Sequence, residues 1–456
     1  MKITFMGATK TVTGSKYLVD TGSKKVLVDC GLFQGHKELT QRNWQHLPVN
    51  PHDLEAVILT HAHIDHTGYV PLLVKNGFSK NIYCSFGTKD LCSILLPDSG
   101  YLQEEQAKHE NAYRHAHTHP QKDLAVPLYT VADAERSLKQ FHPYDFDSEI
   151  EIPKTAKVTL YPAGHIIGAS FVQLKSHGIS VLFSGDIGRF NDPVMEPPVF
   201  MENADYLVLE STYGNHLHGT TNPLDELCNT ITRTLKRSGS IIIPSFAVGR
   251  AQIILYLLYQ LLKANRIPNI PIYLDSPMAI NATELFYKYA AEHRLGKKLS
   301  RLVCNIATYI NTSDESFALH ANHKPKIIIS ASGMAEGGRI LHHIQHYAPN
   351  PHNTLLFIGF QVAGTRGDAL VKGAKETTIY GEKVPINAEV VMLKNLSAHA
   401  DYEEILAWLG HFRKPPKKVF LIHGEPESSL NLKTKIEEKF GWTCVIPDYL
   451  QVENLN

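Results

Sequence analysis

The sequence predicts an α/β protein in which one layered domain is interrupted by a second. The first 212 of its 456 residues contain short strand-like runs set apart by glycine turns and by polar, helical stretches. From about residue 213, isolated and fully apolar strands alternate with long helical segments, which is typical of a parallel sheet covered on both faces. The earlier pattern returns after residue 390. We therefore expect a discontinuous domain, 1–212 plus 391–456, with an inserted domain at 213–390.

The expected strands are short apolar or alternating runs bounded by turn residues. In the first segment they are residues 2–6, 16–20, 25–29, 56–59, 157–161, 172–175, 180–183 and 206–209. In the insertion they are residues 240–243, 270–274, 326–329 and 354–358. The returning segment is expected to contain a strand at 389–393, a helix at 402–412, a strand at 418–422, and a last helix and strand.

The charge is balanced overall but uneven along the chain. The composition, 43% hydrophobic and 20% charged, is that of an ordinary globular protein, with 45 Lys and Arg against 45 Asp and Glu. Residues 213–390 carry 18 basic and 12 acidic side chains, and the rest of the chain carries 27 and 33. Any attraction for a polyanion is therefore expected to be local to the insertion.

The sequence gives no indication of a membrane protein or a secreted one. It has no run of about 18 to 20 apolar residues, and residues 1–5 lead into a strand pattern rather than a signal peptide. The six cysteines are scattered without a Cys-x-x-Cys pair, which argues against a disulfide framework and against sulfur-ligated zinc. We expect a soluble, cytoplasmic protein with no membrane partner.

A cluster of potential metal ligands follows the strand expected at 56–59. His61, His63, Asp65 and His66 lie within six residues, and neutral imidazoles with a carboxylate suit zinc or a similar metal. A polar loop of hydrogen-bonded histidines is the alternative. Four ligands so close in sequence cannot all reach one tetrahedral ion without strain. We therefore expect two ions, each completed by residues from elsewhere in the chain.

Other strand ends offer the missing ligands. His165 follows the strand at 157–161, Asp186 follows the strand at 180–183, and His423 follows the strand at 418–422. A carboxylate such as Asp186 can bridge two cations and hold a shared hydroxide between them. Asp29 ends a further strand, and we expect it to orient a ligand imidazole, with a purely structural turn as the alternative.

The ligand pattern resembles that of a known superfamily. The His-x-His-x-Asp-His sequence of residues 61–66, followed by His165 and Asp186, resembles the signature of the metallo-β-lactamase superfamily. That superfamily contains β-lactamases, thioesterases such as glyoxalase II, lactonases and nucleases. The adjacent Asp65 and His66 are similar to the branches that bind two metal ions.

Three further segments resemble the β-CASP nucleases within that superfamily. Residues 207–214, 397–401 and 422–424 are similar to motifs A, B and C, and they flank the insertion at 213–390. The fold implied is a metallo-β-lactamase αββα sandwich with an inserted parallel-sheet α/β (β-CASP) domain. A histidine at motif B separates the chain from the DNA-repair branch, which has valine there. Because the chain ends at Asn456 without the added domains of the RNase J and many archaeal branches, we expect a stand-alone two-domain ribonuclease.

The resemblance implies zinc-dependent cleavage of single-stranded RNA, as in the pre-mRNA 3′-end-processing endonuclease and its prokaryotic relatives. Two Zn²⁺ are expected, with Mn²⁺ as an alternative metal. The expected ligands are His61, His63 and His165 for one ion, Asp65, His66 and His423 for the other, and Asp186 as the bridge between them. The bridging hydroxide would attack the scissile phosphorus while the metals neutralise charge on the phosphoryl oxygens.

The leaving 3′-oxygen needs a proton, and the resemblance assigns this role to His399. Glu210, at a different strand end, would orient and charge the imidazole of His399. The alternative for His399 is a residue at a helix N-terminus, where only a cap is needed. The alternative for Glu210 is a structural carboxylate.

Three turns rich in small residues follow buried strands of the insertion, at 244–250, 330–334 and 359–367. Small residues expose backbone N–H groups, and a following helix aims its positive end at a phosphate. Such turns also occur in parallel sheets merely for packing. The residues expected to bind RNA phosphates are Ser245, Arg250, Ser330, Ser332, Gly333 and Arg366. A homodimer is compatible with the sequence.

Two other functions remain open at this point. A small-molecule ester or thioester hydrolase of the glyoxalase II or lactonase type would explain the ligands but not the insertion, His399 or His423. A non-catalytic scaffold would not explain why every ligand position is filled. The sequence does not distinguish endonuclease from 5′–3′ exonuclease action, nor does it identify the natural RNA.

Overall fold

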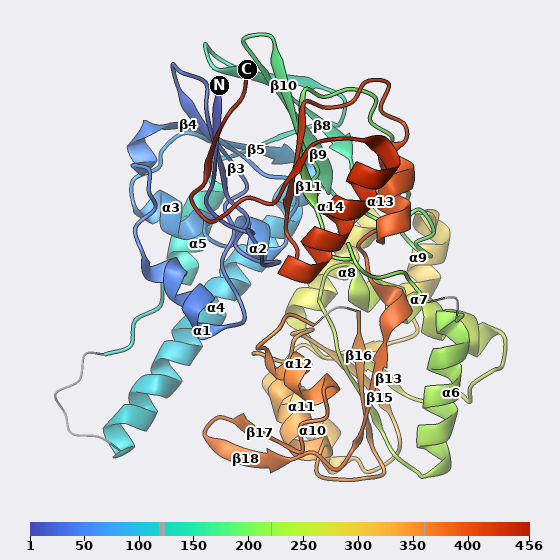
Figure 1. Cartoon of the computed structure of the whole chain (residues 1–456). Coiled ribbons are helices and arrows are strands. Elements are labelled where there is room, and N and C mark those ends of the chain that lie inside the picture. The colour runs from blue at the N-terminus through green and yellow to red at the C-terminus, as the bar shows by residue number, and fades with distance from the viewer. Residues whose placement is uncertain (118–123, 220, 360) are drawn as a thin grey trace. The chain divides into compact units, whose positions relative to one another are not determined.

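The computed structural model describes residues 1–117, 124–219, 221–359 and 361–456. It divides into two compact units, Met1–Leu217 with His399–Asn456 (unit 1) and His218–Ala398 (unit 2). Figure 1 shows unit 1 built from the blue, green-blue and red parts of the chain, because the chain leaves it for unit 2 and then returns.

Unit 1 contains two seven-stranded sheets. The first has the order β22-β1-β2-β3-β4-β5-β6, antiparallel up to β3 and parallel from β3 to β6. Its strands are β1 (Lys2–Phe5), β2 (Tyr17–Asp20), β3 (Lys25–Val28), β4 (Leu54–Ile58), β5 (Asn81–Ser85), β6 (Phe141–Tyr144) and β22 (Val452–Asn454).

The second sheet has the order β21-β20-β11-β10-β9-β8-β7, parallel from β21 to β10 and antiparallel beyond. Its strands are β7 (Glu149–Ile152), β8 (Ala156–Pro162), β9 (Ser170–Ser176), β10 (Ile179–Phe183), β11 (Tyr206–Glu210), β20 (Lys418–Ile422) and β21 (Cys444–Val445).

The core of unit 1 lies between these sheets. Apolar side chains that alternate along the strands of both sheets form one buried cluster. The rings of Phe5 and Phe420, from opposite sheets, have centroids 5.1 Å apart, and those of Tyr17 and Phe183 are 5.9 Å apart. These contacts hold the two sheets face to face.

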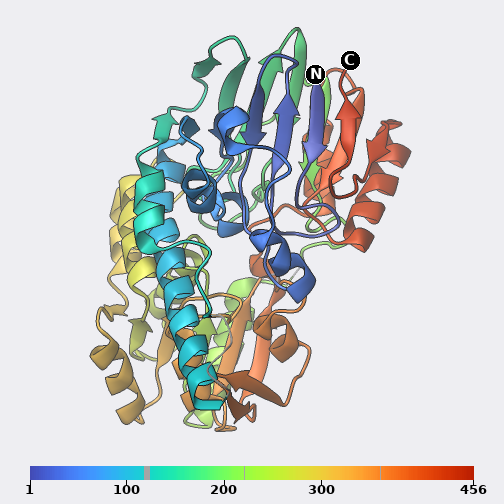
Figure 2. The ribbon, with the colours of Figure 1, turned by 90° about the vertical axis from the view of Figure 1, so that its left-hand side faces the viewer.

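Helices cover the outer faces of the sandwich (Figures 1 and 2). The helices of the N-terminal half are α1 (Lys37–Thr40), α2 (Ile64–Thr67), α3 (Val70–Lys75), α4 (Phe86–His117) and α5 (Val131–Leu138), with short 3-10 turns at Gln41–Trp44 and Pro51–Asp53. On the second sheet lie α13 (Tyr402–Leu409) and α14 (Pro426–Phe440). Trp408 of α13 packs on Phe171 of β9, with their ring centroids 5.0 Å apart. The predicted αββα arrangement is confirmed.

Unit 2 is built around a six-stranded sheet whose order is β14-β13-β15-β12-β16-β19 and whose pairs are all parallel. Its strands are β12 (Ile241–Pro244), β13 (Ile272–Leu274), β14 (Thr308–Tyr309), β15 (Ile327–Ser330), β16 (Thr354–Ile358) and β19 (Glu389–Leu393), and a separate hairpin joins β17 (Glu376–Ile379) to β18 (Glu382–Pro385).

Seven helices accompany this sheet among the described residues of unit 2. They are α6 (Pro223–Lys236), α7 (Arg250–Lys263), α8 (Pro277–Lys288), α9 (Gly296–Cys304), α10 (Ser313–Ala321), α11 (Ile340–Tyr347) and α12 (Arg366–Val371), with a 3-10 turn at Lys394–Leu396. Ile242, Ile328 and Leu355, from three adjacent strands, belong to one buried apolar cluster with residues of α11. The predicted inserted α/β domain with a parallel sheet is confirmed.

One expected strand lies in a different sheet from the one the sequence suggested. The segment Glu389–Leu393 was expected at the return to the first domain, whose boundary was placed at 390/391. It is β19, and it pairs with β16 along its whole length, from Thr354 with Glu389 to Ile358 with Leu393. An apolar run predicts a strand but not its pairing partner. The second compact unit ends at Ala398, and the first resumes at His399.

The sequence analysis also left residues 81–152 without strands, whereas β5, β6 and β7 lie there. Each has only four or five residues: β5 is buried at every position except Asn81, β6 contains Pro143, and β7 alternates Glu with Ile, so none offers a long apolar or alternating run. In the described parts of the chain, no helix combines the length and the apolar character that crossing a bilayer requires.

Candidate metal centre and acid pair

The predicted site residues of unit 1 follow strands that end at the same edge of the sandwich. Residues 61–66 follow β4, His165 follows β8, Asp186 follows β10, His423 follows β20, and Glu210 is the last residue of β11. The carboxyl ends of parallel strands carry loops that converge on one crevice. The fold therefore brings together ligands that lie up to 362 positions apart in sequence.

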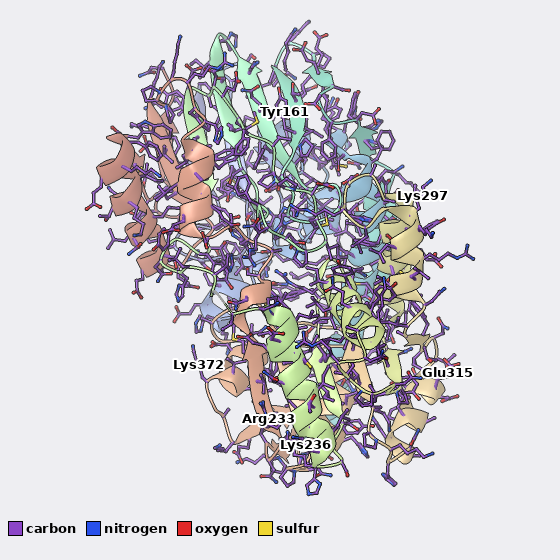
Figure 3. The ribbon with its side chains drawn as sticks, turned by 90° about the vertical axis from the view of Figure 1, so that its right-hand side faces the viewer. Tyr161, Arg233, Lys236, Lys297, Glu315 and Lys372 are labelled. Carbon is purple, nitrogen blue, oxygen red and sulfur yellow. The ribbon has the colours of Figure 1, made fainter. Side chains whose placement is uncertain are left out.

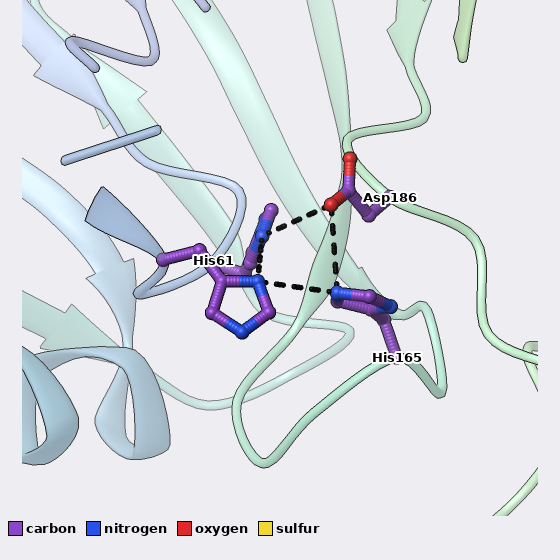
Figure 4. A group of neighbouring side chains, drawn as sticks. His61, His165 and Asp186 are labelled. Atoms are coloured by element: carbon purple, nitrogen blue, oxygen red, sulfur yellow. Dashed lines mark hydrogen bonds and ion pairs between the residues drawn. The ribbon is translucent and has the colours of Figure 1, made fainter. Parts of the chain in front are cut away.

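The first ligand group consists of His61, His63, His165 and Asp186. Nδ1 of His63 lies 3.1 Å from Nε2 of His61 and 3.2 Å from Nε2 of His165. Oδ2 of Asp186 lies 3.3 Å from Nε2 of His61 and 3.4 Å from Nε2 of His165. Figure 4 shows the side chains of His61, His165 and Asp186 pointing toward one another. With bonds of about 2.0–2.1 Å, the ligand atoms of a tetrahedral zinc lie about 3.3 Å apart, so this spacing fits one ion.

The second ligand group consists of Asp65, His66 and His423. Nε2 of His423 lies 3.3 Å from both Nε2 of His66 and Oδ2 of Asp65. Oδ1 of Asp186 lies 3.3 Å from Nε2 of His66. Asp186 therefore presents one carboxylate oxygen to each group, which is the arrangement of a bridging ligand.

The protonation of the first group suits metal binding. Burial lowers the pKa of His61, His63 and His165, with additional repulsion from neighbouring imidazoles, and the pKa of His63 falls to about 3. These rings are therefore neutral at pH 7, and a neutral imidazole offers the lone pair that a metal needs.

At the second group the carboxylates favour a positive charge close to them. Burial lowers the pKa of His66, but the carboxylates of Asp186 and Asp29 outweigh burial and raise it well above the ordinary value. Burial raises the pKa of Asp186, and the surrounding histidines outweigh burial and hold it well below the ordinary value. An ionised Asp186 in a buried place needs a cation beside it.

Asp29 holds one of the ligand imidazoles. Its carboxylate lies 2.8 Å from Nδ1 of His66, and it accepts hydrogen bonds from the backbone N–H of Thr60 at 2.8 Å and from the Thr60 hydroxyl. Nδ1 of His66 is therefore paired with Asp29, and Nε2 of the same ring faces the other ligands. Gly31 lets this loop approach residues 61–66, because a Cβ there would lie 1.6 Å from the carbonyl oxygen of Asp65.

The residues present fit a bound metal. Oδ1 of Asp186 is buried and accepts no hydrogen bond from any of the described residues. A buried acceptor without a hydrogen bond raises the free energy of the folded state unless another partner, such as a metal ion, contacts it. Together with five imidazoles and the carboxylate of Asp65, it makes a nitrogen and oxygen donor set of the kind that zinc prefers.

His399 lies beside the two ligand groups and faces Glu210. Its Nδ1 lies 3.0 Å from Oε2 of Glu210 and 3.9 Å from Oδ2 of Asp186, and its ring centroid is 4.7 Å from that of His165. The cap of the following helix α13 is Asp401, whose side chain accepts from the backbone N–H of Glu404. His399 is therefore not the capping residue, and its contacts are with the site.

Glu210 is fully buried and held from several directions. It accepts a short hydrogen bond from the backbone N–H of Ile187 and one of 2.6 Å from the hydroxyl of Thr212. Thr212 and Thr60 are site residues to which the sequence analysis gave no role. Both lie two residues after a strand end, and Thr212 also lies within residues 207–214, the segment that resembles motif A.

The predicted phosphate-binding residues lie in unit 2, at the carboxyl ends of β12, β15 and β16. Ser245 follows β12 and Ser330 is the last residue of β15, which pairs with β12; the backbone N–H of Ser245 donates to the carbonyl of Ser330 at 3.0 Å. The hydroxyl of Ser332 accepts from the backbone N–H of Glu336, and Gly333 packs beneath the ring of Phe246.

The two arginines expected beside a phosphate contact protein groups. The buried Arg250 donates to the carbonyl of Leu396. Arg366 uses all three guanidinium nitrogens, donating to the carbonyls of Ala335 and Thr378 and to the hydroxyl of Thr377. These contacts hold Arg366 against the β17–β18 hairpin, and its place beside an RNA phosphate stays a prediction.

A sandwich of this type with a histidine and aspartate cluster at the carboxyl ends of its strands defines a metal-dependent hydrolase. Comparison with protein families agrees. Residues 11–227 match the metallo-β-lactamase superfamily, residues 251–370 match the Beta-Casp domain, and residues 383–447 match the Zn-dependent metallo-hydrolase RNA specificity domain. The chain belongs to the β-CASP family of the metallo-β-lactamase superfamily, as the sequence analysis predicted.

Several characterised proteins are similar along most of the chain. A ribonuclease of Thermus thermophilus is 34% identical over 440 residues, which are 95% of each chain. An RNase J-like protein of Methanocaldococcus jannaschii is 30% identical over 462 residues, covering 98% of this chain and 97% of its own. The transcription termination factor FttA of Pyrococcus abyssi is 30% identical over 482 residues, covering 100% of this chain and 71% of its own.

Among solved structures, a protein of unknown function from Enterococcus faecalis has a similar fold. The TM-score is 0.53 at 14% sequence identity, and the match covers 100% of this chain and 99% of that one. This likeness shows the fold alone.

Proposed function

We propose that the protein is a zinc-dependent ribonuclease that hydrolyses phosphodiester bonds of single-stranded RNA. The observation that carries the proposal is the His399–Glu210 pair, in which His399 lies against the two ligand groups and belongs to no group of potential metal ligands among the described residues. A hydrolase that expels an alkoxide needs a proton donor at this place. The relatives named as ribonuclease and RNase J-like, and the match to an RNA specificity domain, support RNA as the substrate.

The two ligand groups would each hold one Zn²⁺, with Asp186 contacting both. Zinc ions bound there would lower the pKa of a water molecule to near 7 and neutralise charge that develops on the phosphoryl oxygens. The chain's contribution is to fix the ligands. Asp29 fixes the ring of His66, and the hydroxyl of Thr60 lies 3.1 Å from Nδ1 of His61.

His399 would protonate the leaving 3′-oxygen. Its Nδ1 faces the carboxylate of Glu210, so Nε2 is the ring atom assigned to proton donation. A carboxylate in this position favours the protonated imidazole and fixes the plane of the ring. The side chain of His399 is 15% exposed, whereas that of Glu210 is 0% exposed, so of the two only the histidine can meet a substrate.

Unit 2 would bind the polynucleotide through its sugar-phosphate backbone. The turns after β12, β15 and β16 supply Ser245, Ser330, Ser332 and Gly333 for this role. Exposed cations of α9, among them Lys297, add an attractive field; Figure 3 shows Lys297 at the surface of this helix. Binding of this kind carries little base information and weakens with salt.

The test is cleavage of defined RNAs by purified, zinc-loaded protein. A single-stranded RNA labelled at its 5′ end and the same RNA labelled internally are incubated with the protein, beside a duplex of the same sequence and a simple thioester. We expect cleavage of the single strand and not of the thioester. Mononucleotide release indicates exonuclease action, and internal fragments indicate endonuclease action. Thioester hydrolysis without RNA cleavage would favour a small-molecule hydrolase instead.

A further inference from the structure

The hydroxyl of Thr212 lies between the second ligand group and the His399–Glu210 pair. Its Oγ1 is 2.6 Å from Oε2 of Glu210 and 3.0 Å from Nδ1 of His423. His423 belongs to the second ligand group, and Glu210 holds His399. The side chain of Thr212 is therefore a direct connection between a metal ligand and the partner of the acid.

The hydrogen-bond inventory of these groups restricts how they pair. A hydroxyl has one hydrogen to donate, and Oγ1 of Thr212 has two acceptors in reach, the carboxylate of Glu210 at 2.6 Å and the carbonyl of His423 at 3.0 Å. If His423 uses Nε2 as a ligand atom, its Nδ1 carries the hydrogen and donates to Thr212. The Thr212 hydroxyl then donates to the closer acceptor, the carboxylate of Glu210.

This pairing also fixes Glu210. Its Oε2 accepts from the Thr212 hydroxyl and from Nδ1 of His399, while Oε1 accepts from the backbone N–H of Ile187. Without the hydroxyl, Oε2 would have only the histidine as a donor, and the carboxylate could turn about its last bond. The orientation of His399 would then be less well defined.

We propose that Thr212 is a positioning residue that sets the ring orientation of His423 for the second metal ion and, through Glu210, the orientation of His399. The second part rests on the proposed ribonuclease function, whereas the first concerns metal binding alone. Oriented outer contacts of this kind typically change metal affinity or activity by about 10–100-fold.

The neighbouring Ser211 separates this role from a structural one. Its hydroxyl is equally buried and donates to the carbonyl of Ile422 at 2.9 Å, with the hydroxyl of Ser429 at 2.8 Å. The hydroxyl joins β11 to β20 and α14 and, within the described part of the chain, makes no hydrogen bond to a proposed ligand or to His399. The backbone N–H of Ser211 donates to the carbonyl of His423 at 3.2 Å, and replacement of the side chain leaves that bond in place. Ser211→Ala is therefore a matched control for the loss of one buried hydroxyl at the same strand end.

The experiment compares Thr212→Val, which keeps the shape but removes the hydroxyl, with Thr212→Ser, which keeps the hydroxyl. Zinc affinity and stoichiometry are measured by competition with a chelating dye, and cleavage is measured at saturating zinc. For Thr212→Val we expect the zinc affinity of one of two sites, the one that contains His423, to fall by about 10-fold or more, and kcat to fall by a similar factor with KM unchanged. Thr212→Ser and Ser211→Ala should stay within about 3-fold of wild type, below the effect of losing an oriented contact.

Two results would overturn the proposal: Thr212→Val with wild-type zinc affinity and kcat, or Thr212→Ser and Ser211→Ala as impaired as Thr212→Val. If Thr212→Val does not fold, the same comparison is made with Thr212→Ala against Thr212→Ser. Zinc titration needs no RNA substrate. Absence of ribonuclease activity in the wild type would therefore refute the proposed function while the titration still decides the metal part.

Discussion

Replacing His399 with alanine should remove most of the cleavage while leaving the metal centre intact. The contacts among the ligand atoms span 3.1–3.4 Å, whereas Nδ1 of His399 lies 3.9 Å from the nearest oxygen of Asp186. Glu210 keeps the hydrogen bonds from Ile187 and Thr212 after the substitution, so no buried carboxylate is left without donors. We therefore expect wild-type zinc content and little change in stability.

The loss of a positioned general acid typically slows the chemical step by about 10²–10⁴-fold. At about 1.4 kcal/mol for each factor of ten, this corresponds to about 3–5.5 kcal/mol of transition-state stabilisation. The assay is single-turnover cleavage of an RNA with one labelled linkage, compared with the same RNA carrying sulfur in place of the leaving 3′-oxygen. A thiolate leaves without protonation, so the sulfur substrate should recover most of the rate in His399→Ala.

His411→Ala is the control, since His411 is an exposed histidine of unit 1 stacked on Phe200 and should change neither rate. The assignment of His399 as the acid would be refuted if the variant cleaved the ordinary RNA at the normal rate. It would equally fail if both substrates slowed by the same factor, because the defect would then lie before protonation of the leaving group.

Three other outcomes are expected. Asp29→Asn should weaken zinc binding by about 10–100-fold, because Asn cannot hold Nδ1 of His66 with the same charge; a chelator titration checks this, and unchanged affinity would contradict it. Burial lowers the pKa of Lys16 to about 8 from an ordinary 10.5, so the unfolded chain binds more protons between these values and wild-type stability rises from pH 8 to 10.5. Lys16→Met should lack this rise, which amounts to up to about 3 kcal/mol in the free energy of unfolding measured with denaturant. The argument would be refuted if the free energies of unfolding of wild type and variant ran parallel with pH. Lys297→Gln with Lys298→Gln should reduce the slope of log affinity for single-stranded RNA against log salt by about 1.4, since each neutralised contact contributes about 0.7; an unchanged slope would remove α9 from the RNA-binding surface.

Much of the site could be read from the sequence because its residues stand in a recognisable relation to strands. His61 to His66, His165, Asp186 and His423 each follow an apolar run, and the carboxyl ends of such runs meet at one edge of a layered fold. Four ligands crowded into residues 61–66 also require completion from elsewhere. These inferences depend on local patterns and on spacing, both of which are present in the chain before it folds.

Other features were not accessible in that way. Residues 389–393 are plainly a strand, but only pairing with β16 assigns them to the sheet of unit 2. Arg366 reads as a phosphate ligand after a glycine-rich turn, yet its guanidinium is used by Ala335, Thr377 and Thr378. In both cases the outcome depends on partners that lie outside the local pattern, so the pattern does not specify them.

The chain alone thus predicted most of the strands, the residues proposed as ligands and the class of chemistry, because these follow from residue types at fixed local spacing. The tertiary structure decided which oxygen of Asp186 faces which ligand group, and that Glu210 rather than a helix end holds His399. It also decided that the hydroxyl of Thr212 joins Glu210 to His423. Hydrogen bonds and metal contacts depend on separations of a few tenths of an ångström between groups from different strands, and only the packed sandwich fixes distances of that size.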